Sequence, residues 1–223
     1  MSQCSDTFRV RMRGELACFT RPEMKVERVS YEVITPSAAR GVIESILWKP
    51  QIMWRIHAIE VLAPITWTSF RRNEVTSRAS TRINEIIVDD NRTQRNTVAL
   101  KDVDYVVEAS FTLTPLADKT DSVVKYVEMF LRRLHKGQHY HAPYLGCREF
   151  QAIVEGAPPY VKPLDVDRSL GWMFYDFNWP NMSNGATKDS AVIRPLLFEA
   201  HLKNGVLRVP TREFTYEGLG VQR

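Results

Sequence analysis

Apolar and polar residues alternate from residue 8 to residue 19, which predicts a β-strand with one buried face. Val10 and Met12 fall on the apolar side, whereas the other side carries Arg9, Arg11 and Arg13. Three arginines on one sheet face are compatible with a solvated face and, equally, with a surface that contacts phosphates. Residues rich in β-branched and aromatic side chains predict further strands at 52–62 and 104–114 and a short one at 149–154.

Two segments carry apolar residues at helical spacing. The first helix is predicted to start with Thr35 as its cap and Pro36 in its first turn, and to stop at Lys49 because Pro50 follows. The second is predicted from residue 121 to Lys136, before Gly137. Its apolar face is expected to hold Val123, Val124, Val127, Phe130, Leu131 and Leu134. The opposite stripe is expected to hold Lys125, Met129, Arg132 and Lys136, with Tyr126 and Arg133 on its flank.

The order of these elements is β-α-β-β-α-β, which predicts an α+β fold of the ferredoxin-like type found in RRM domains. We expect this domain to cover residues 1–155, with an insertion at 63–103. Within the insertion, Ile83–Val88 and Arg95–Leu100 flank a DDNR turn and predict a projecting hairpin. Residues 156–223 are predicted to form a small antiparallel β-sheet extension with a turn at residues 203–205. Its aromatic residues are expected in the core: Trp172, Phe174, Tyr175, Phe177 and Trp179.

The composition narrows the class of protein. Hydrophobic residues make up 44% of the 223 positions and charged residues 25%, as in soluble globular proteins. No apolar run approaches the roughly 20 residues of a membrane span, and no signal peptide is evident. Cys4, Cys18 and Cys147 are scattered and odd in number, which favours reduced thiols over a disulfide framework or a zinc site. We therefore expect a cytoplasmic protein without a membrane partner.

The positive charge is concentrated in one window. Residues 125–148 contain five Lys or Arg and one Glu, so this window alone carries the net charge of +4 of the whole chain. It also holds three of the five histidines: His135, His139 and His141. We interpret the second helix as presenting a cationic ridge (Lys125, Arg132, Arg133 and Lys136) that continues into a His-rich loop and suits a polyanion. An ordinary solvated helix face is the alternative.

The insertion offers a second candidate surface. Trp67 and Phe70 are interleaved with Arg71, Arg72 and, further on, Arg78. Aromatic rings that stack on bases, next to guanidinium groups that hold phosphates, suit single-stranded RNA. Several acidic residues lie in the same segment, so a solvated protrusion is the alternative.

Motifs for a metal or a nucleotide cofactor are lacking: no HExxH, Walker loop, GxGxxG or GxSxG occurs, so neither a cofactor nor a metal is predicted. The strand at 104–114 also lacks the RNP motif with which RRM domains stack bases. If the chain carries out chemistry, RNA permits a metal-free route, in which the 2′-hydroxyl attacks its own phosphate with help from a base and nearby cations.

Four stretches carry a resemblance to a known family: SYEVITPSAARGVIESILWKP (30–50), VALKDVDY (98–105), HAPYLGCREF (141–150) and LGWMFYDFNW (170–179). Together they resemble the Cas-five subunit of type I-C CRISPR systems. The resemblance implies an RRM-like domain with an appended sheet and metal-independent cleavage of precursor CRISPR RNA. It also implies that the protein stays on the 5′ handle, with CRISPR repeat RNA and the other effector-complex subunits as partners. Double-stranded DNA is a further candidate partner.

Members of that family are described with a catalytic Tyr, Lys and His. Here the Lys corresponds to Lys125, while Tyr126 stands in place of the His and Leu47 in place of the Tyr. The candidate catalytic residues are therefore Lys125, Tyr126, His139 and His141. The candidate RNA-binding residues are Arg40, Trp48, Lys49, Trp67, Phe70, Arg71, Arg72, Arg132, Arg133 and Lys136.

Three functions stay open at this point. The first is a metal-independent endoribonuclease acting on CRISPR repeat RNA. The second is a non-catalytic RNA-binding scaffold of a CRISPR ribonucleoprotein, which Leu47 and Tyr126 favour. The third is a general nucleic-acid-binding domain unrelated to CRISPR.

Overall fold

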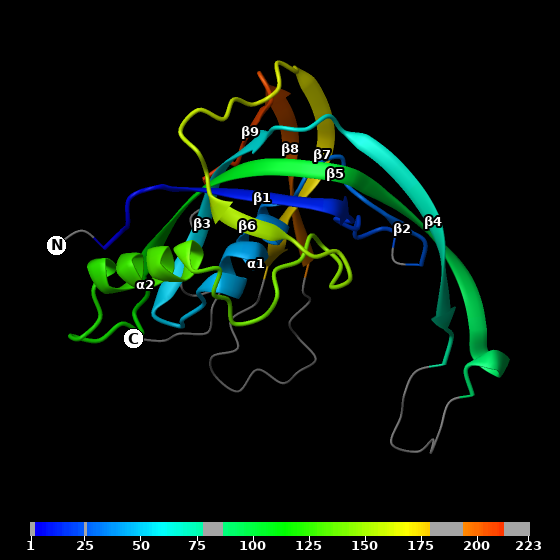
Figure 1. Cartoon of the computed structure of the whole chain (residues 1–223), viewed down its shortest axis with the longest axis horizontal. Helices are drawn as coiled ribbons and strands as arrows, with labels where there is room; N and C mark the ends of the chain where they lie inside the picture. The colour runs from blue at the N-terminus through cyan, green and yellow to red at the C-terminus, as the bar shows by residue number, and fades with distance from the viewer. Residues whose placement is uncertain (1–2, 25, 78–86, 179–193, 212–223) are drawn as a thin grey trace.

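The computed structural model describes residues 3–24, 26–77, 87–178 and 194–211. The protein is a mixed α/β structure, built from one large, mainly antiparallel sheet and two helices, as Figure 1 shows. The helices are α1 (Pro36–Ile46) and α2 (Val123–His135), and a short 3₁₀ helix covers Asp89–Asn91. The strands are β1 (Phe8–Ala17), β2 (Arg28–Val29), β3 (Ile52–Val61), β4 (Thr66–Val75), β5 (Arg92–Leu113), β6 (Ile153–Gly156), β7 (Arg168–Asn178), β8 (Arg194–Lys203) and β9 (Val206–Arg208).

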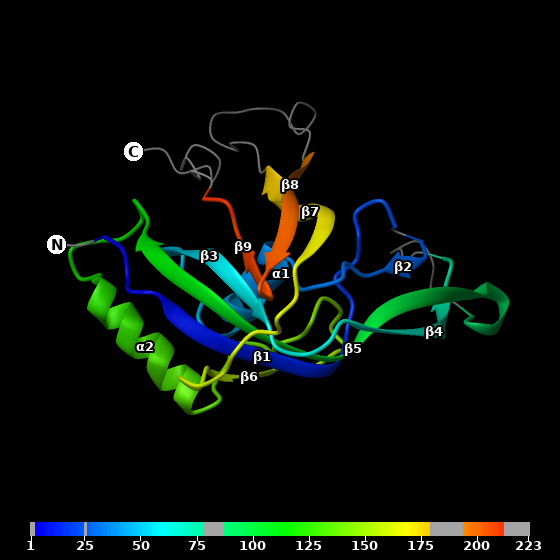
Figure 2. The ribbon, with the colours of Figure 1, turned by 90° about the horizontal axis from the view of Figure 1, so that it is seen from above.

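The long strand β5 is the spine of the sheet, whose strand order is β6-β1-β5-β3-β9-β8-β7. β1 and β3 flank the C-terminal part of β5, and β4 pairs with its N-terminal part, antiparallel in each case. β2 adds a short parallel pairing to β5. The β4–β5 ribbon extends well away from the rest of the molecule (Figures 1 and 2).

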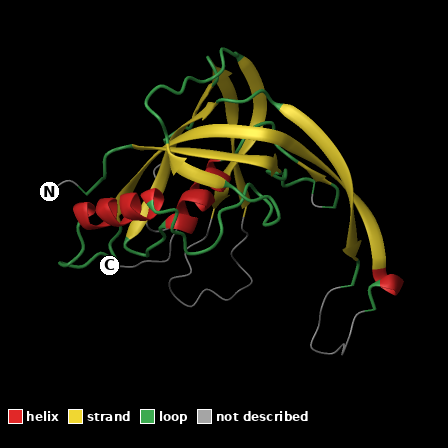
Figure 3. Cartoon of the chain, in the orientation of Figure 1, coloured by secondary structure: helices red, strands yellow, loops and turns green. Residues whose placement is uncertain are grey.

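The two helices lie on the same side of the sheet (Figure 3), and the core fills the space between them and the strands. Trp54 of β3 lies at its centre. Its ring centroid is 4.8 Å from that of Phe130 in α2 and 5.1 Å from that of Phe111 in β5. Its indole Nε1 donates a hydrogen bond of 2.9 Å to the carbonyl oxygen of Leu47, which follows α1. One side chain therefore connects both helices to the sheet.

The predicted start of α1 is confirmed: the Thr35 side chain accepts a hydrogen bond of 3.2 Å from the Ala38 amide, and Pro36 is the first helical residue. The predicted hairpin at 83–100 is wrong. β4 is the partner of β5 there, with Trp67 opposite Leu100, and Ile87 and Val88 precede the 3₁₀ helix. Residues 83–86 lie outside the described part of the chain. β5 runs unbroken from Arg92 to Leu113, and Asp102 within it adopts a φ of 51°.

The three arginines of β1 serve neither of the two expected roles. The Arg9 guanidinium binds both oxygens of Glu60, at 2.7 and 2.8 Å, and Arg11 likewise binds Asp104, at 2.6 and 3.0 Å. Arg13 lies 3.6 Å from Glu155 on β6. Each guanidinium is matched by a carboxylate from another strand of the sheet, so this sheet face carries a row of ion pairs.

The C-terminal strands extend the same sheet, because β9 pairs with β3. The predicted turn is confirmed, with Asn204 and Gly205 at φ values of 48° and 71°. Trp172 was expected in the core, yet it is 63% exposed, because Met173 and Tyr175 occupy the inward positions of the edge strand β7. Phe177 is also exposed, and Trp179 lies outside the described residues. None of the described helices has the length and apolarity needed to cross a membrane.

Candidate functional site

At the start of α2, the side chains of Lys125 and Tyr126 both bind the carboxylate of Asp121. Ser122 caps the helix, and the Lys125 ammonium lies 2.8 Å from Asp121 Oδ1. The Tyr126 hydroxyl donates a hydrogen bond of 2.5 Å to the same oxygen. Hydrogen bonds from these two side chains lower the pKa of Asp121 to about 2. Burial, with the neighbouring carboxylate, raises the pKa of Tyr126. A buried phenol whose proton is already shared with a carboxylate is a poor general base.

Tyr126 was expected on the flank of the cationic ridge, and that expectation is wrong. It is 3% exposed and packs edge-on against Phe111. The buried stripe of α2 is Tyr126, Phe130 and Leu134, spaced four residues apart, and this rotation leaves Val124 exposed rather than buried.

The His-rich loop is fixed on the C-terminal ends of both helices. The Tyr140 amide donates a hydrogen bond of 2.7 Å to the carbonyl of Ser45 in α1, and the Gln138 amide donates one of 2.8 Å to the carbonyl of Arg133 in α2. The Arg133 guanidinium donates a bond of 2.7 Å to the carbonyl of Ile46. His139 and His141, both exposed, are therefore carried by a positioned backbone.

Two grooves lie beside this loop. One, of about 220 Å³, is lined by His139, Gln138 and Arg133 together with apolar residues of α1 and β6. The other, of about 190 Å³, lies between α1 and the loop and is lined by His141, Tyr144 and Gly41 among others. The rings of His141 and Tyr144 are 6.0 Å apart. The first groove thus combines an imidazole and a guanidinium.

The four candidate catalytic residues do not form one site. Lys125 lies in the first turn of α2 and His139 beyond its last turn. At a rise of 1.5 Å per residue, Lys125 and Lys136 are about 16 Å apart along the helix axis. Leu47, which stands in place of the family's Tyr, is fully buried beside Trp54. The arrangement brings His139 and Arg133 together instead.

Unpaired positive charge lies at the C-terminal end of the ridge. Arg132 and Lys136 are exposed, and neither has an ion-pair partner within the described ranges. Because the ammonium of Lys125 is matched by Asp121, the unmatched positive charge of the ridge lies near the His-rich loop.

Among the candidates around α1, Arg40 is predicted to contact RNA, and the structure shows its guanidinium engaged in ion pairs within the protein. Its guanidinium pairs with the nearly buried Asp176 of β7 and lies 3.5 Å from Glu44. Trp48 is 60% exposed just after the helix, and Lys49 beside it is half-buried.

The candidates on β4 divide between two faces. Trp67, 42% exposed, and Arg71 lie on the open face. Phe70 and Arg72 lie on the opposite face, where Phe70 packs against Phe150 and Arg72 pairs with Glu149. Trp67 and Arg71 can therefore meet a ligand in this structure, whereas Phe70 and Arg72 are covered. Arg78 lies outside the described residues.

Sequence reasoning missed one cluster, in which Cys18 and Cys147 meet beside Arg28 and Arg72. No local sequence pattern indicates this cluster, because its members come from four separate segments of the chain. Within the part of the chain that the structure describes, no group of three or more His, Cys, Asp or Glu is arranged to hold a metal ion.

A match to a family model places the chain among the CRISPR-associated proteins. It belongs to the family described as CRISPR-associated protein (Cas_Cas5), whose model for the Cas5d type matches residues 7–210. The resemblance seen in the sequence is thereby confirmed.

Two curated relatives carry the name "CRISPR pre-crRNA endoribonuclease Cas5d". The one from Mannheimia succiniciproducens is 41% identical and covers 92% of this chain and 96% of its own. The one from Thermus thermophilus is 42% identical and covers 92% of each. A solved structure titled "Crystal Structure of CRISPR-associated Protein" shares the fold, with a TM-score of 0.69, 21% identity and 96% of each chain covered.

Proposed function

We propose that this protein is an endoribonuclease that cuts CRISPR precursor RNA and stays bound to the 5′ handle within the effector complex. The names of two relatives that are about 41% identical over 92% of the chain support the substrate and the reaction. The observation that carries the mechanism is the groove shared by His139 and Arg133.

In this mechanism the substrate's own 2′-hydroxyl is the nucleophile. His139 accepts its proton, and the Arg133 guanidinium stabilises the negative charge that develops on the phosphorane. Loss of such an electrostatic partner costs on the order of 3–4 kcal/mol, or about a hundred- to a thousandfold in rate. Arg132 and Lys136 hold neighbouring phosphates, and Trp67 and Arg71 contact the RNA from the β4–β5 ribbon.

We also propose that the part of the sheet ordered β6-β1-β5-β3, with α1 and α2, is an RRM-like unit. Four strands in this order, with two helices on one side, are what a β-α-β-β-α-β chain with alternating strand directions gives, and this supports the assignment. β4 then belongs to the insertion at 63–103, and β7–β9 to the extension.

The test is incubation of the purified protein with its own repeat RNA in EDTA, followed by mapping of the product ends. We expect cleavage to persist, to leave a 2′,3′-cyclic phosphate, and to stop when the nucleotide before the cut is 2′-deoxy. His139→Ala should slow cleavage by about a hundredfold or more. The matched control is His135→Ala, an exposed histidine that does not line the groove.

Cleavage of the 2′-deoxy substrate would exclude this mechanism. Full activity of His139→Ala combined with loss of activity in His141→Ala would indicate that His141, in the second groove, is the general base. The second candidate function is a non-catalytic RNA-binding scaffold, which the buried positions of Leu47 and Tyr126 favour. Tight binding of the handle without any cleavage would support that function instead.

A further inference from the structure

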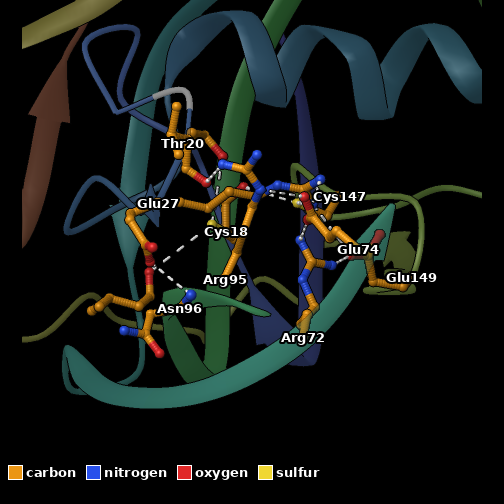
Figure 4. Close-up of polar contacts among 12 residues, drawn as sticks. Cys18, Thr20, Glu27, Arg72, Glu74, Arg95, Asn96, Cys147 and Glu149 are labelled. Carbon is orange, nitrogen blue, oxygen red and sulfur yellow. Dashed lines mark hydrogen bonds and ion pairs between the residues drawn. The ribbon is translucent and has the colours of Figure 1, made fainter. Parts of the chain in front are cut away.

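Cys18 and Cys147 are 129 residues apart in sequence and in contact in the structure (Figure 4). Cys18 directly follows β1, and its amide donates a hydrogen bond of 3.0 Å to the carbonyl of Leu145. The Cys147 sulfur lies 3.9 Å from the Cys18 carbonyl oxygen, and the Cys18 sulfur lies 3.6 Å from the Thr20 hydroxyl oxygen.

Gly146 allows this close approach. Its φ is 84°, and a Cβ at this position would lie 2.0 Å from the Cys18 carbonyl oxygen. Only glycine combines that φ with so little space. The loop that carries Cys147 is therefore held against the end of β1 by its backbone, which keeps Cys147 next to Cys18.

The two sulfurs have different surroundings. Cys147 is half-buried, and its sulfur lies 3.6 Å from the Arg28 Nη1 atom. The hydrogen bond from Cys18, followed by the positive charge of Arg28, lowers the pKa of Cys147 to about 6, although burial opposes this. The hydrogen bond to Cys147, together with burial, raises the pKa of Cys18, which is 1% exposed. Cys147 is thus the more exposed and the more acidic of the two thiols.

Other charged groups also surround the pair. Glu149 and Glu74 each lie within 3.5 Å of the Arg28 guanidinium, and Arg72 pairs with Glu149. The groups that face the two sulfurs are Thr20 after β1, Arg28 of β2, Arg72 and Glu74 of β4, and Glu149 of the loop. Arg95 of β5 adds a pairing of 3.3 Å to Glu74. The arginines outnumber the carboxylates here, so the cluster favours a thiolate.

We propose that Cys147 is a peroxide-reactive thiolate that closes a reversible disulfide with Cys18. The Cys147 thiolate attacks one oxygen of hydrogen peroxide, the O–O bond breaks, and hydroxide leaves. Cys18 sulfur then attacks the sulfur of the resulting sulfenic acid; the S–O bond breaks, and the Cys18 proton leaves with that oxygen as water. Two thiols lose two electrons in total, and the peroxide is reduced to two waters. This inference does not depend on the proposed ribonuclease function.

The first experiment measures the rate of alkylation of each cysteine by iodoacetamide against pH, with peptide mass spectrometry on the wild-type protein. We expect the Cys147 rate to titrate with a midpoint near pH 6, whereas an ordinary cysteine titrates at about 8.5. Arg28→Gln should move the midpoint upward, and Arg132→Gln, an exposed arginine of α2, should leave it unchanged. A wild-type midpoint near 8.5 would overturn the proposal.

The second experiment treats the protein with equimolar hydrogen peroxide and maps a non-reducing digest. We expect a peptide pair that joins Cys18 to Cys147 and that disappears after addition of dithiothreitol. Cys4→Ser should keep this product, and Cys18→Ser should leave a sulfenic acid that dimedone traps at Cys147. Because the mapping needs only the wild-type protein, a variant that fails to fold cannot obscure the result. Absence of the linked peptides, or linkage through Cys4, would refute the proposal.

Discussion

Asp121 accepts bonds from both Lys125 and Tyr126, so it fixes the first turn of α2. Its pKa in the folded protein, about 2, lies below the roughly 3.9 of an unfolded chain. A depressed pKa contributes stability that is fully present above about pH 4. This contribution is lost as the pH falls from about 4 to about 2, since the carboxylate then takes up a proton in both states.

Replacing Tyr126 by Phe tests the role of this residue in chemistry. The ring stays packed against Phe111, and only the hydroxyl bonded to Asp121 is lost. We therefore expect a lower melting temperature and an unchanged rate of RNA cleavage. Thermal unfolding and a cleavage time course measure the two effects, and Tyr140→Phe, at an exposed position, should change neither. Loss of cleavage without a loss of stability would show that the Tyr126 hydroxyl takes part in catalysis.

Helical periodicity could predict α2 but not the rotation of the helix about its axis. A tyrosine has an apolar ring and a polar end, so the pattern alone could place Tyr126 on either side. Its hydrogen-bond partner, Asp121, precedes the helix, where the periodicity gives no information. The prediction that Val124 lies on the buried face was wrong for the same reason.

At the scale of elements, the unpaired charges of α2 predict a salt dependence of RNA binding. Arg132 and Lys136 are exposed and without an ion pair inside the described ranges, so each is expected to release about one counterion per phosphate contact. Each Ala substitution should flatten the slope of log K against log salt by about 0.7 to 1. Fluorescence titration of handle RNA at several salt concentrations measures the slope.

Lys203→Ala is the control, because this exposed lysine lies at the end of β8, away from α2. It should leave the slope unchanged. A slope that also stays constant in the Arg132/Lys136 double mutant would mean that the ridge is only a solvated surface.

The β4–β5 ribbon predicts a difference between two exposed tryptophans. Trp67→Ala should weaken RNA binding by about 1–3 kcal/mol, the usual value of stacking on one base, and Trp172→Ala should not. Trp172 is 63% exposed and Trp67 42% exposed, so both changes should cost much less folding stability than the loss of a core tryptophan. Binding titrations and urea unfolding measure these effects. Equal losses of affinity in the two variants would indicate that RNA also contacts β7.

The division of β4 into two faces could have been read from the sequence, since Trp67 and Phe70 are three residues apart and side chains alternate along a strand. The pairing of β4 with β5 was harder to predict. The polar residues Lys101, Asp102 and Asp104 interrupt the apolar pattern within residues 92–113, so the sequence does not show that they form one strand.

Two glycines near the His-rich loop predict opposite effects on stability. A Cβ at Gly41, within α1, would meet nothing within 4 Å, so Gly41→Ala should stabilise the helix by about 0.5–1 kcal/mol. Gly146→Ala should destabilise the protein strongly, because of its φ of 84° and the nearby Cys18 carbonyl. Melting temperatures decide between these outcomes, and a stabilised Gly146→Ala variant would contradict the close approach of the loop to β1.

At the scale of the whole molecule, sequence patterns could not predict the contacts between segments that are distant in the chain. Strands, helix starts and turns follow from local chemistry, and most of them were predicted. The pairing of Arg40 with Asp176 joins residues 136 positions apart, and the register of β3 with β9 likewise depends on the completed fold. The sequence predicted a small C-terminal sheet, and the structure shows that its strands continue the large sheet and share its core.

That continuity predicts a single unfolding transition for the chain. The Asp176 side chain is 5% exposed and forms two hydrogen bonds with Arg40 of α1, so it connects β7 to the N-terminal half of the protein. Asp176→Asn removes the nearer of the two carboxylates that face the Arg40 guanidinium and leaves only Glu44, at 3.5 Å, which should cost up to about 3 kcal/mol. Urea unfolding should show this loss equally by tryptophan fluorescence, in which the buried Trp54 takes part, and by far-UV circular dichroism.

Glu199→Gln is the matched control. This carboxylate on the neighbouring β8 is exposed and pairs with an exposed histidine, so its loss should cost less than about 0.5 kcal/mol. Two separate transitions, with only one shifted by Asp176→Asn, would show that the C-terminal strands fold as a domain of their own.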